Sequence, residues 1–452
     1  MADTNPIIIV QGGQWGSEAK GHIAAYICET EKVDIAVRTG ATNAGHTVMY
    51  KRDPDTAKSL EAAMYFDGCG HQPVKMQQLP VGWVNPATDL VLGAGSLIDP
   101  KILAAECELI TRLTGSDVRK RLYIDYRAGV HRPIHAERSA ASGRQHRIGA
   151  TGKGCSEALI DRIRGRGDDY RVFGRTSWAQ DYQVMDTARA LNDKWDAGAK
   201  ILLEGTQGTL LDLYLGPYPY TTHKQTTPAV WMAEAGLSPA LPTDIVLVVR
   251  TYPIRVAGNS GPMSREISWP DLARAINGKR AAHSLPPIVD DSAIQTFEES
   301  VRHVVARGWQ GRVPRGSNGL DQHTWGPDDR KFYSVAVSEI HKEALDLIEY
   351  EDGHRTPGVL PQLLRLFEMT TVTKKLRRVA MLSGVDLIVS ALQCRPHRVA
   401  LTFMNYEYPE HWYVAPTKVP DTGQLVGAVE RACRAPVSLL SFGPASSHVV
   451  RR

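Results

Sequence analysis

Short β-branched runs alternate with longer amphipathic stretches through much of the chain, and this alternation constrains the fold more than any other sequence feature. Parallel strands need long crossover connections, which are usually helical, so the alternation is typical of an α/β fold. We therefore expect a large, mostly parallel sheet flanked by helices. The predicted strands are residues 7–10, 34–38, 89–93, 200–204, 244–250, 378–382 and 437–441.

The clearest helix signal lies in residues 99–113, which begin with Asp99 and Pro100. Aspartate is a favoured N-cap and proline is favoured at the first helical position, so this segment predicts a helix. Residues 275–330 are rich in glycine, proline and charge, and predict loops or a peripheral excursion. The predicted organisation is a single domain, residues 1–452, with peripheral insertions at about 51–80 and 270–330.

Composition excludes several classes of protein. The 452 residues are 42% hydrophobic, enough to bury a substantial core, and the formal net charge of +4 is too small to indicate a nucleic-acid surface. No apolar run approaches the roughly 18 residues that a membrane span needs. The six cysteines lie far apart without a CxxC pair, so we expect neither a disulfide framework nor a zinc ribbon. This cysteine usage favours a cytoplasmic location.

The segment "IIIVQGGQWGSEAKG", residues 7–21, combines an apolar run, a glycine-rich turn and the start of a helix. Free backbone N–H groups and the helix dipole attract anions at such a junction. The segment is not a Walker A motif, because Lys20 is followed by Gly21 rather than by serine or threonine. It predicts a phosphate-binding loop, with a plain tight turn as the alternative.

Three further loops offer amides, hydroxyls or cations beside an apolar strand. They are "TNAGHT" (42–47), "ATGKGCSEALIDRIRGRG" (150–167) and "LLEGTQGTLLDLYLGPYPYTTHKQTTP" (202–228). Together with the first loop they predict one pocket for a multiply phosphorylated ligand.

In the same order along the chain, these motifs resemble those of adenylosuccinate synthetase. They are "GGQWGSEAKG", "TNAGHT", "TGKGC…DR", "EGTQGTLLDLYLGPYPYTT", "YPIRVAG…GP" and "SFGP". The resemblance is greatest to the archaeal and phage branch, which includes the 2-aminoadenylosuccinate synthetases. It implies a fold related to the P-loop GTPases, a homodimer, and a ligase that joins L-aspartate to IMP with GTP and Mg²⁺. In that reaction the γ-phosphoryl group moves to the C6 oxygen, and an amine then displaces phosphate.

The resemblance assigns roles to individual residues. His46 matches the histidine that stabilises the transferring phosphoryl group, Gln207 lies beside the reacting base edge, and the Gly45 carbonyl matches a magnesium ligand. The implied NTP-binding residues are Gly16, Glu18, Ala19, Lys20, Gly21, Gly45, His46, Thr47, Asp386, Ser441, Gly443 and Pro444. The implied purine-nucleotide residues are Asn43, Thr151, Gln207, Thr222 and Val256, with Arg164 or Arg166 replacing an arginine that the partner subunit supplies. Gly384 replaces the lysine beside Asp386, so either GTP or ATP could serve as the energy donor.

Ser17 departs from the family pattern, which has an aspartate as catalytic base and magnesium ligand. A serine hydroxyl is a poor base at neutral pH and a weaker magnesium ligand. The phage 2-aminoadenylosuccinate synthetases, which use dGMP, share this replacement, and the smaller side chain leaves room for the guanine 2-amino group. A changed base with IMP retained is the alternative.

The second departure concerns the loop that binds aspartate, in which the family has Thr-Gly followed by four basic residues. Counting back without gaps from residues 335–337 aligns it with Thr324–Asp329, so Asp328 and Asp329 replace cations and would repel a dicarboxylate. Arg330 could shift into the gap. In a displaced alignment, Arg312, Arg315 or Arg330 would take over the task.

These departures favour an NTP- and Mg²⁺-dependent ligase that activates C6 of a 6-oxopurine nucleotide, either IMP or (d)GMP. The coupled amine would be an amino sugar or another hydroxylated or cationic amine rather than aspartate. The alternatives are 2-aminoadenylosuccinate synthesis from dGMP and L-aspartate, conventional adenylosuccinate synthesis, and an inactive nucleotide-binding paralogue. Retention of His46, Gln207 and Lys20 argues against inactivity.

Overall fold

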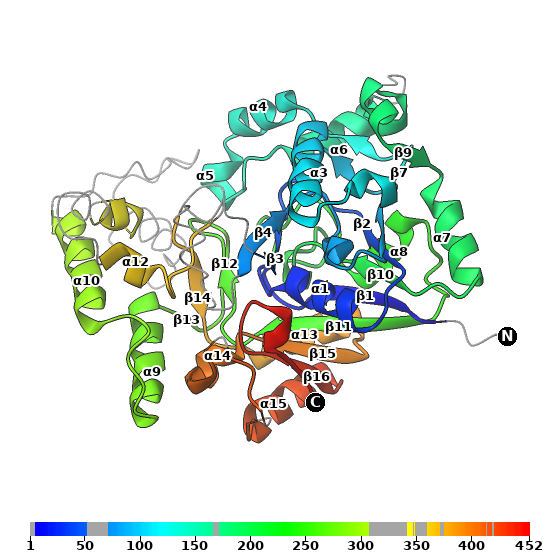
Figure 1. The fold of residues 1–452 in the computed structure, drawn as a ribbon. Coiled ribbons are helices and arrows are strands. Elements are labelled where there is room, and N and C mark those ends of the chain that lie inside the picture. Colours follow the sequence, from blue (N-terminus) through cyan, green and yellow to red (C-terminus); the bar gives the residue numbers. More distant parts are fainter. Residues whose placement is uncertain are drawn as a thin grey trace.

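The computed structural model describes residues 5–51, 71–165, 171–306, 341–346, 348, 359–370, 375–412, 414–417 and 420–452. Ten strands form the main sheet, in the order β17-β16-β15-β11-β1-β10-β2-β5-β7-β9 (Figure 1). Every neighbouring pair is parallel except β16 and β17. The strands are β1 (Ile7–Gly12), β2 (Ile35–Arg38), β5 (Asp89–Leu92), β7 (Leu122–Asp125), β9 (Gln183–Met185), β10 (Ile201–Glu204), β11 (Thr243–Arg250), β15 (Arg398–Thr402), β16 (Val437–Ser441) and β17 (Val449–Arg451). The predicted α/β class is confirmed.

Side chains alternate across the central strand β1, and each face has its own core. Ile8 and Val10 belong to one hydrophobic cluster and Ile7 and Ile9 to another, because successive residues of a strand point to opposite faces. Helices α1 (Lys20–Thr30) and α3 (Pro100–Thr114) cover the first face; α7 (Thr187–Asp196) and α8 (Pro228–Ala235) cover the second. Helices α13 (Gly384–Cys394) and α15 (Gly423–Cys433) pack beside β15 and β16. Burial on both faces explains the continuous apolar runs of these strands.

The predicted helix in residues 99–113 is confirmed as α3. The Asp99 carboxylate accepts hydrogen bonds from the backbone N–H groups of Lys101 (3.0 Å) and Ile102 (3.3 Å). Gly115, with φ of 71°, ends the helix in the left-handed conformation that glycine adopts without strain.

Residues 378–382 lie apart from the main sheet. They contain β14 (Arg378–Ala380), which pairs antiparallel with β12 (Ile254–Arg255) and β13 (Glu266–Ile267) in a small separate sheet. The predicted strand exists, but the parallel pairing expected for it is wrong.

A second hydrophobic core packs against this small sheet. It is formed by α9 (Trp269–Ala282), α10 (Asp291–Ala306), α12 (Val359–Leu363) and the segment 341–346. The ring of Phe367 lies 5.8 Å from that of Trp269 and 5.2 Å from that of Phe297, between centroids. Residues 275–306 are therefore mainly helical rather than loops, and residues 307–330 lie outside the described ranges.

Shorter elements surround the carboxyl end of the sheet. They are α4 (Pro133–Ala141), α5 (Arg144–Ile148), α6 (Cys155–Arg164), α14 (Met404–Glu407) and the strand pairs β3 (His46–Lys51) with β4 (His71–Met76) and β6 (Leu97–Ile98) with β8 (Gly129–Val130). Within the ranges given above, no helix is long and apolar enough to cross a membrane.

Candidate active site

The loop between β1 and α1 has a backbone that only a specialised turn adopts. Gly16, Ser17 and Ala19 have φ of 88°, 60° and 67°. The buried Glu18 carboxylate accepts N–H groups from Gln14 (3.0 Å) and Gly16 (2.8 Å) and pairs with Lys20 Nζ at 2.6 Å. Among the described residues no side chain caps α1, so its first N–H groups are available to an anion.

A cavity of about 1760 Å³ opens at this loop, at the carboxyl ends of the central strands. Ligands of open α/β sheets bind at this end of the strands. Most of the predicted site residues line it together: Gly16, Ser17, Ala19, Lys20, Gly21, Asn43, Gly45, His46, Thr47, Thr151, Gln207, Thr222, Val256, Ser441, Gly443 and Pro444. Their individual roles stay predictions.

Other predicted residues do not line the cavity. The Glu18 carboxylate is bound within the loop, and Arg164 lies in the last turn of α6. Asp386 lies in the first turn of α13, where its N–H donates to Ser383 Oγ at 3.3 Å. Burial raises the pKa of Asp386. Arg166, Thr324, Asp328, Asp329 and Arg330 lie outside the described residues.

His46 is held by two charged residues that the sequence motifs did not single out. Arg38 and Glu204 are register partners at the ends of β2 and β10, and their side chains pair at 2.5 Å between Nη1 and Oε1. The same Oε1 contacts His46 Nδ1, and Glu204 Oε2 accepts the Val81 N–H at 2.7 Å. The available signal was a charged residue at the end of each of two predicted strands, residues 34–38 and 200–204.

Burial is the main cause that lowers the pKa of His46 to about 4; nearby Arg38 adds to it, and Glu204 opposes it. Burial raises the pKa of Glu204, but its interactions with His46 and Arg38 outweigh this effect and leave the pKa below its ordinary value. At neutral pH the pair is thus a carboxylate and a neutral imidazole. The short contact requires a proton on Nδ1, which donates to Glu204. Within the described residues Nε2 is buried without a partner, so it is left for a ligand.

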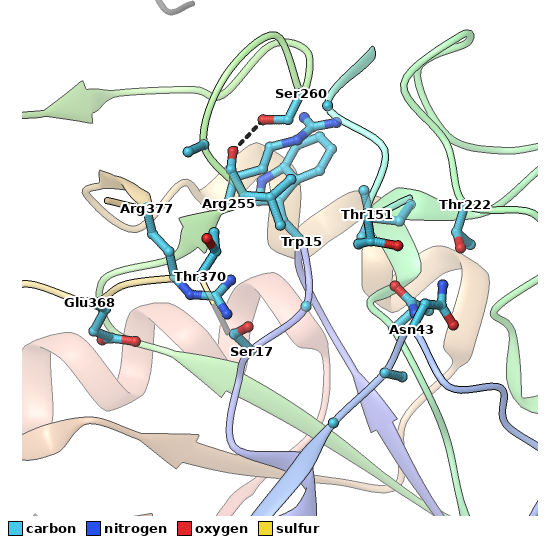
Figure 2. A pocket seen from close by; sticks show the side chains of 18 of the residues that line it. Trp15, Ser17, Asn43, Thr151, Thr222, Arg255, Ser260, Glu368, Thr370 and Arg377 are labelled. Carbon is cyan, nitrogen blue, oxygen red and sulfur yellow. Dashed lines mark hydrogen bonds between the residues drawn. The ribbon is translucent and has the colours of Figure 1, made fainter. Parts of the chain in front are cut away.

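A stacked pair lies above the loop. The Arg255 guanidinium carbon is 4.0 Å from the centre of the Trp15 ring, and Arg255 donates to the carbonyl oxygens of Pro262 and Tyr220. Burial lowers the pKa of Arg255 to about 9, helped by nearby Arg378. Figure 2 shows this pair on one side of the cavity, with Asn43, Thr151 and Thr222 on the other.

The sequence interpretation missed a group of cations. Residues 368–370 and 375–377 pair antiparallel, with Thr370 N–H donating to the Lys375 carbonyl at 2.7 Å; we call them the cationic hairpin. Thr370, Lys375 and Arg377 line the cavity, and Figure 2 shows Arg377 extending toward Ser17. The basic run in "TTVTKKLRR" (370–378) was the available signal.

Arg250 connects the cationic hairpin to the phosphate loop. Its buried guanidinium pairs with Glu368, donates to the Ser17 carbonyl at 3.4 Å, and lies 3.6 Å from the centre of the Phe403 ring. The hydroxyl of Tyr406 donates to the same Glu368 carboxylate at 3.3 Å. The hairpin is therefore fixed beside Ser17.

The residues predicted to bind Mg²⁺ are neutral oxygen donors, the Ser17 hydroxyl and the Gly45 carbonyl, and both lie at the cavity wall. Magnesium in nucleotide sites keeps several waters and takes few protein ligands besides phosphate oxygens, so this donor set fits a nucleotide-bound ion. In the part of the chain that the structure describes, no cluster of three or more His, Cys, Asp or Glu side chains could hold a metal by itself.

A parallel sheet with a glycine-rich loop at its centre, an uncapped helix N-terminus and a buried histidine beside them is typical of an α/β enzyme that binds a nucleotide. The family model for adenylosuccinate synthetase matches residues 9–172 and 169–283. The chain belongs to the adenylosuccinate synthetase family, whose members are ligases that form a carbon–nitrogen bond. The family generally depends on GTP and Mg²⁺.

Related proteins support this membership. Adenylosuccinate synthetase of Methanocaldococcus jannaschii is 34% identical over 264 residues, which cover 58% of this chain and 68% of that protein. Adenylosuccinate synthetase of Thermococcus onnurineus is 35% identical over 273 residues, which cover 60% of this chain and 72% of that protein. The fold is similar to that of cyanophage S-2L succinoaminodeoxyadenylate synthetase (PurZ), bound to dGMP and dATP, with a TM-score of 0.63, 23% identity and 99% and 95% of the two chains covered. It is also similar to that of adenylosuccinate synthetase from Plasmodium falciparum, with a TM-score of 0.62, 17% identity and 99% and 100% covered.

Proposed function

We propose that this ligase uses a nucleoside triphosphate and Mg²⁺ to phosphorylate the C6 oxygen of a guanine nucleotide, and then couples a carboxylate-bearing amine such as L-aspartate. The observation that carries the proposal is that Ser17 and the cations of the hairpin, Lys375 and Arg377, line one cavity. The phage protein of similar fold was solved with dGMP and with dATP as energy donor, which is consistent with this choice of substrates.

Ser17 supports a guanine acceptor. Its side chain is short, neutral and exposed to the cavity, at the position where the family carries an aspartate. An aspartate there would be bulkier and charged, whereas a serine leaves room for an exocyclic amino group. Its hydroxyl can also accept a hydrogen bond from that group.

The hairpin supports an anionic amine. Lys375 and Arg377 follow a threonine-containing segment, which is the family's order of threonine and then basic residues in its aspartate-binding loop. Guanidinium and ammonium groups bind carboxylates through charge-assisted hydrogen bonds. Arg312, Arg315 and Arg330, which the displaced alignment named, lie outside the described residues, so that alternative stays a prediction; the cations proposed here are Lys375 and Arg377.

A cationic or hydroxylated amine is the second candidate. Glu343 and Asp346 also line the cavity and would attract an ammonium group. Asp328 and Asp329, on which the earlier expectation rested, lie outside the described residues, so that expectation stays a prediction.

The energy donor is proposed to be ATP or GTP. Asp386, which was expected to read guanine, does not line the cavity, whereas the buried Asn405 does. An amide both donates and accepts hydrogen bonds, so it suits adenine as well as guanine, while a carboxylate only accepts and selects guanine.

The cavity residues can perform the two steps. The N–H groups of α1 and Lys20 hold the triphosphate, and His46 keeps Nδ1–H on Glu204; its Nε2 must take up a proton to donate a hydrogen bond to an oxygen of the transferring group. Magnesium, held by Ser17 and Gly45, would neutralise phosphate charge. The C6 oxygen forms a bond to the γ-phosphorus as the β–γ bridging bond breaks and the N1 proton passes to water; the amine then bonds to C6 as phosphate leaves, and the amine nitrogen releases a proton to water.

Phosphate release tests the proposal. Purified protein would be incubated with Mg·ATP or Mg·GTP, with dGMP, GMP or IMP, and with L-aspartate, glucosamine or spermidine, and the coupled nucleotide identified by mass spectrometry. We expect turnover with a guanine nucleotide and aspartate. Turnover with glucosamine or spermidine but not aspartate would support the second candidate, and turnover with IMP alone would refute the role given to Ser17.

A further inference from the structure

Lys75 lies at the same end of the cavity as the phosphate loop, although no motif singled it out. It belongs to β4, which pairs antiparallel with β3, and its register partner is Thr47. Val74 and Met76 are buried in the main core, so alternation along the strand turns Lys75 to the opposite face. Thr47, Met49 and Lys75 all line the cavity. One face of this strand pair is thus a cavity wall.

The side chain of Lys75 runs over Gly45. A Cβ placed on Gly45 would lie 3.4 Å from Cε and 3.5 Å from both Cδ and Cγ of Lys75. Gly45 directly precedes His46. A Cβ placed on Gly21, in the first turn of α1, would lie 2.5 Å from the Cβ of His46. Lys75, the 45–47 segment and the N-terminus of α1 are therefore neighbours.

The phosphate loop itself brings little net positive charge. Lys20 is its cation, but Lys20 Nζ pairs at 2.6 Å with the buried carboxylate of Glu18. What remains is the partial charge of the helix N-terminus, roughly half an elementary charge. A magnesium-bound nucleoside triphosphate retains about two negative charges in excess of the metal, so a further cation beside Gly45 would stabilise it.

We propose that Lys75 binds the β- and γ-phosphate end of the nucleoside triphosphate. The inference rests on the proposed function, because it takes the ligand of this loop to be a nucleoside triphosphate. The Lys75 side chain reaches the cavity from β4 and passes over Gly45, and its charge would complement the amides of α1. Removing the charge of Lys75 weakens binding of the triphosphate and leaves binding of the purine nucleotide and of the amine unaffected.

The test compares Lys75→Met and Lys75→Arg with wild type, and uses Lys101→Met, an exposed lysine on α3, as the matched control. Affinities for the magnesium complex of the non-hydrolysable β,γ-imido analogues of ATP and GTP, and for dGMP, are measured by calorimetry. Loss of one charge-assisted hydrogen bond predicts an affinity about tenfold to a hundredfold lower for Lys75→Met. We expect the loss for Lys75→Arg to be less than about threefold, and dGMP affinity to be unchanged in both variants.

The outcomes separate this inference from the function on which it rests. If wild type binds neither analogue, the proposed function fails and the inference with it. If wild type binds an analogue and Lys75→Met binds it equally well, or loses dGMP affinity to the same degree, only the role of Lys75 is refuted. Thermal unfolding of each variant shows whether a loss of affinity reflects a loss of fold.

Discussion

Replacing Glu204 tests whether the buried carboxylate serves the chemistry of His46 or only the fold. Glu204 is fully buried, its partner Arg38 is 1% exposed, and the two are joined at 2.5 Å. Removing one partner of a buried ion pair costs about 3–5 kcal/mol, since the other charge stays in a medium of low polarity. The Val81 N–H would also lose its acceptor, which costs about 1–3 kcal/mol.

Glu204→Ala is therefore expected to lower the free energy of unfolding by about 4–8 kcal/mol, a large part of the total stability of an ordinary domain. Glu204→Gln keeps the shape but has a single acceptor oxygen, so if that oxygen accepts the Val81 N–H, the amide NH2 replaces the oxygen that Arg38 and His46 contact. We expect it to cost about 2–4 kcal/mol. A stable Glu204→Ala protein would contradict the buried ion pair.

The catalytic effect of Glu204→Gln should exceed its structural effect. The carboxylate keeps the proton of His46 on Nδ1 and leaves Nε2 for the ligand, and replacing the carboxylate partner of a catalytic histidine by its amide has cost about 10⁴ in another enzyme. We expect kcat for phosphate release to fall by about 10²–10⁴-fold. The assay is steady-state phosphate release, with urea unfolding measured in parallel.

Glu106→Gln is the matched control. Glu106 is also buried and accepts three backbone N–H groups, from Gln77, Gln78 and Leu79, but it does not line the cavity. It should lose stability and keep kcat within about threefold. If Glu204→Gln likewise keeps kcat within that range, Glu204 does not orient His46.

Three further predictions concern the amine, the acceptor and pH. Arg377→Met should raise KM for aspartate about a hundredfold, because charge-assisted hydrogen bonds are lost, and should leave KM for the triphosphate unchanged. Equal rises in both KM values would refute a role of Arg377 that is specific to the amine. Ser17→Asp should move the ratio of kcat/KM for dGMP over IMP toward IMP by about tenfold or more, and an unchanged ratio would disprove the acceptor role. Burial lowers the pKa of His22 to about 3 and that of His46 to about 4. Near and below pH 6.5 the unfolded chain therefore binds more protons than the folded one, and the free energy of unfolding decreases as the pH is lowered. Between pH 7.5 and 5.5, urea unfolding should show a loss of about 1.4 kcal/mol for each histidine, and His22→Asn should remove its share.

The main sheet and the cavity wall formed by the loop between β1 and α1 could be predicted because their signals are local. The turn at Gly16 and the cation at Lys20 lie next to the strand and helix that they join, so one short motif specifies the phosphate loop. The burial of Arg38 and Glu204 could not be predicted in the same way, because charged residues at strand ends are usually exposed. Their pairing depends on β2 and β10 being neighbours in the sheet.

The sequence alone does not locate the amine side securely, because counting without gaps assumes an invariant spacing, and the predicted residues Thr324–Asp329 lie outside the described ranges. Between β13 and the cationic hairpin the structure has α9, α10 and α12, which build a core of their own. These helices lie outside the interval between residues 324 and 337, so they do not test the count that aligned Thr324–Asp329 with the basic loop, and that alignment stays a prediction. The basic run at 374–378 gave too weak a signal by itself, since charge runs are most often solvated surface.

Arg250 explains why the position of the hairpin was not encoded locally. Its buried guanidinium joins Ser17 of the phosphate loop to Glu368, 118 positions further along the chain than Arg250. Because an unpaired buried arginine costs about 3–5 kcal/mol, this contact holds the hairpin against the loop more strongly than any exposed ion pair could. The residues beyond Glu368 can then change while the loop stays fixed. If the hairpin binds the amine as proposed, the amine donor could change there without a change in the phosphate loop.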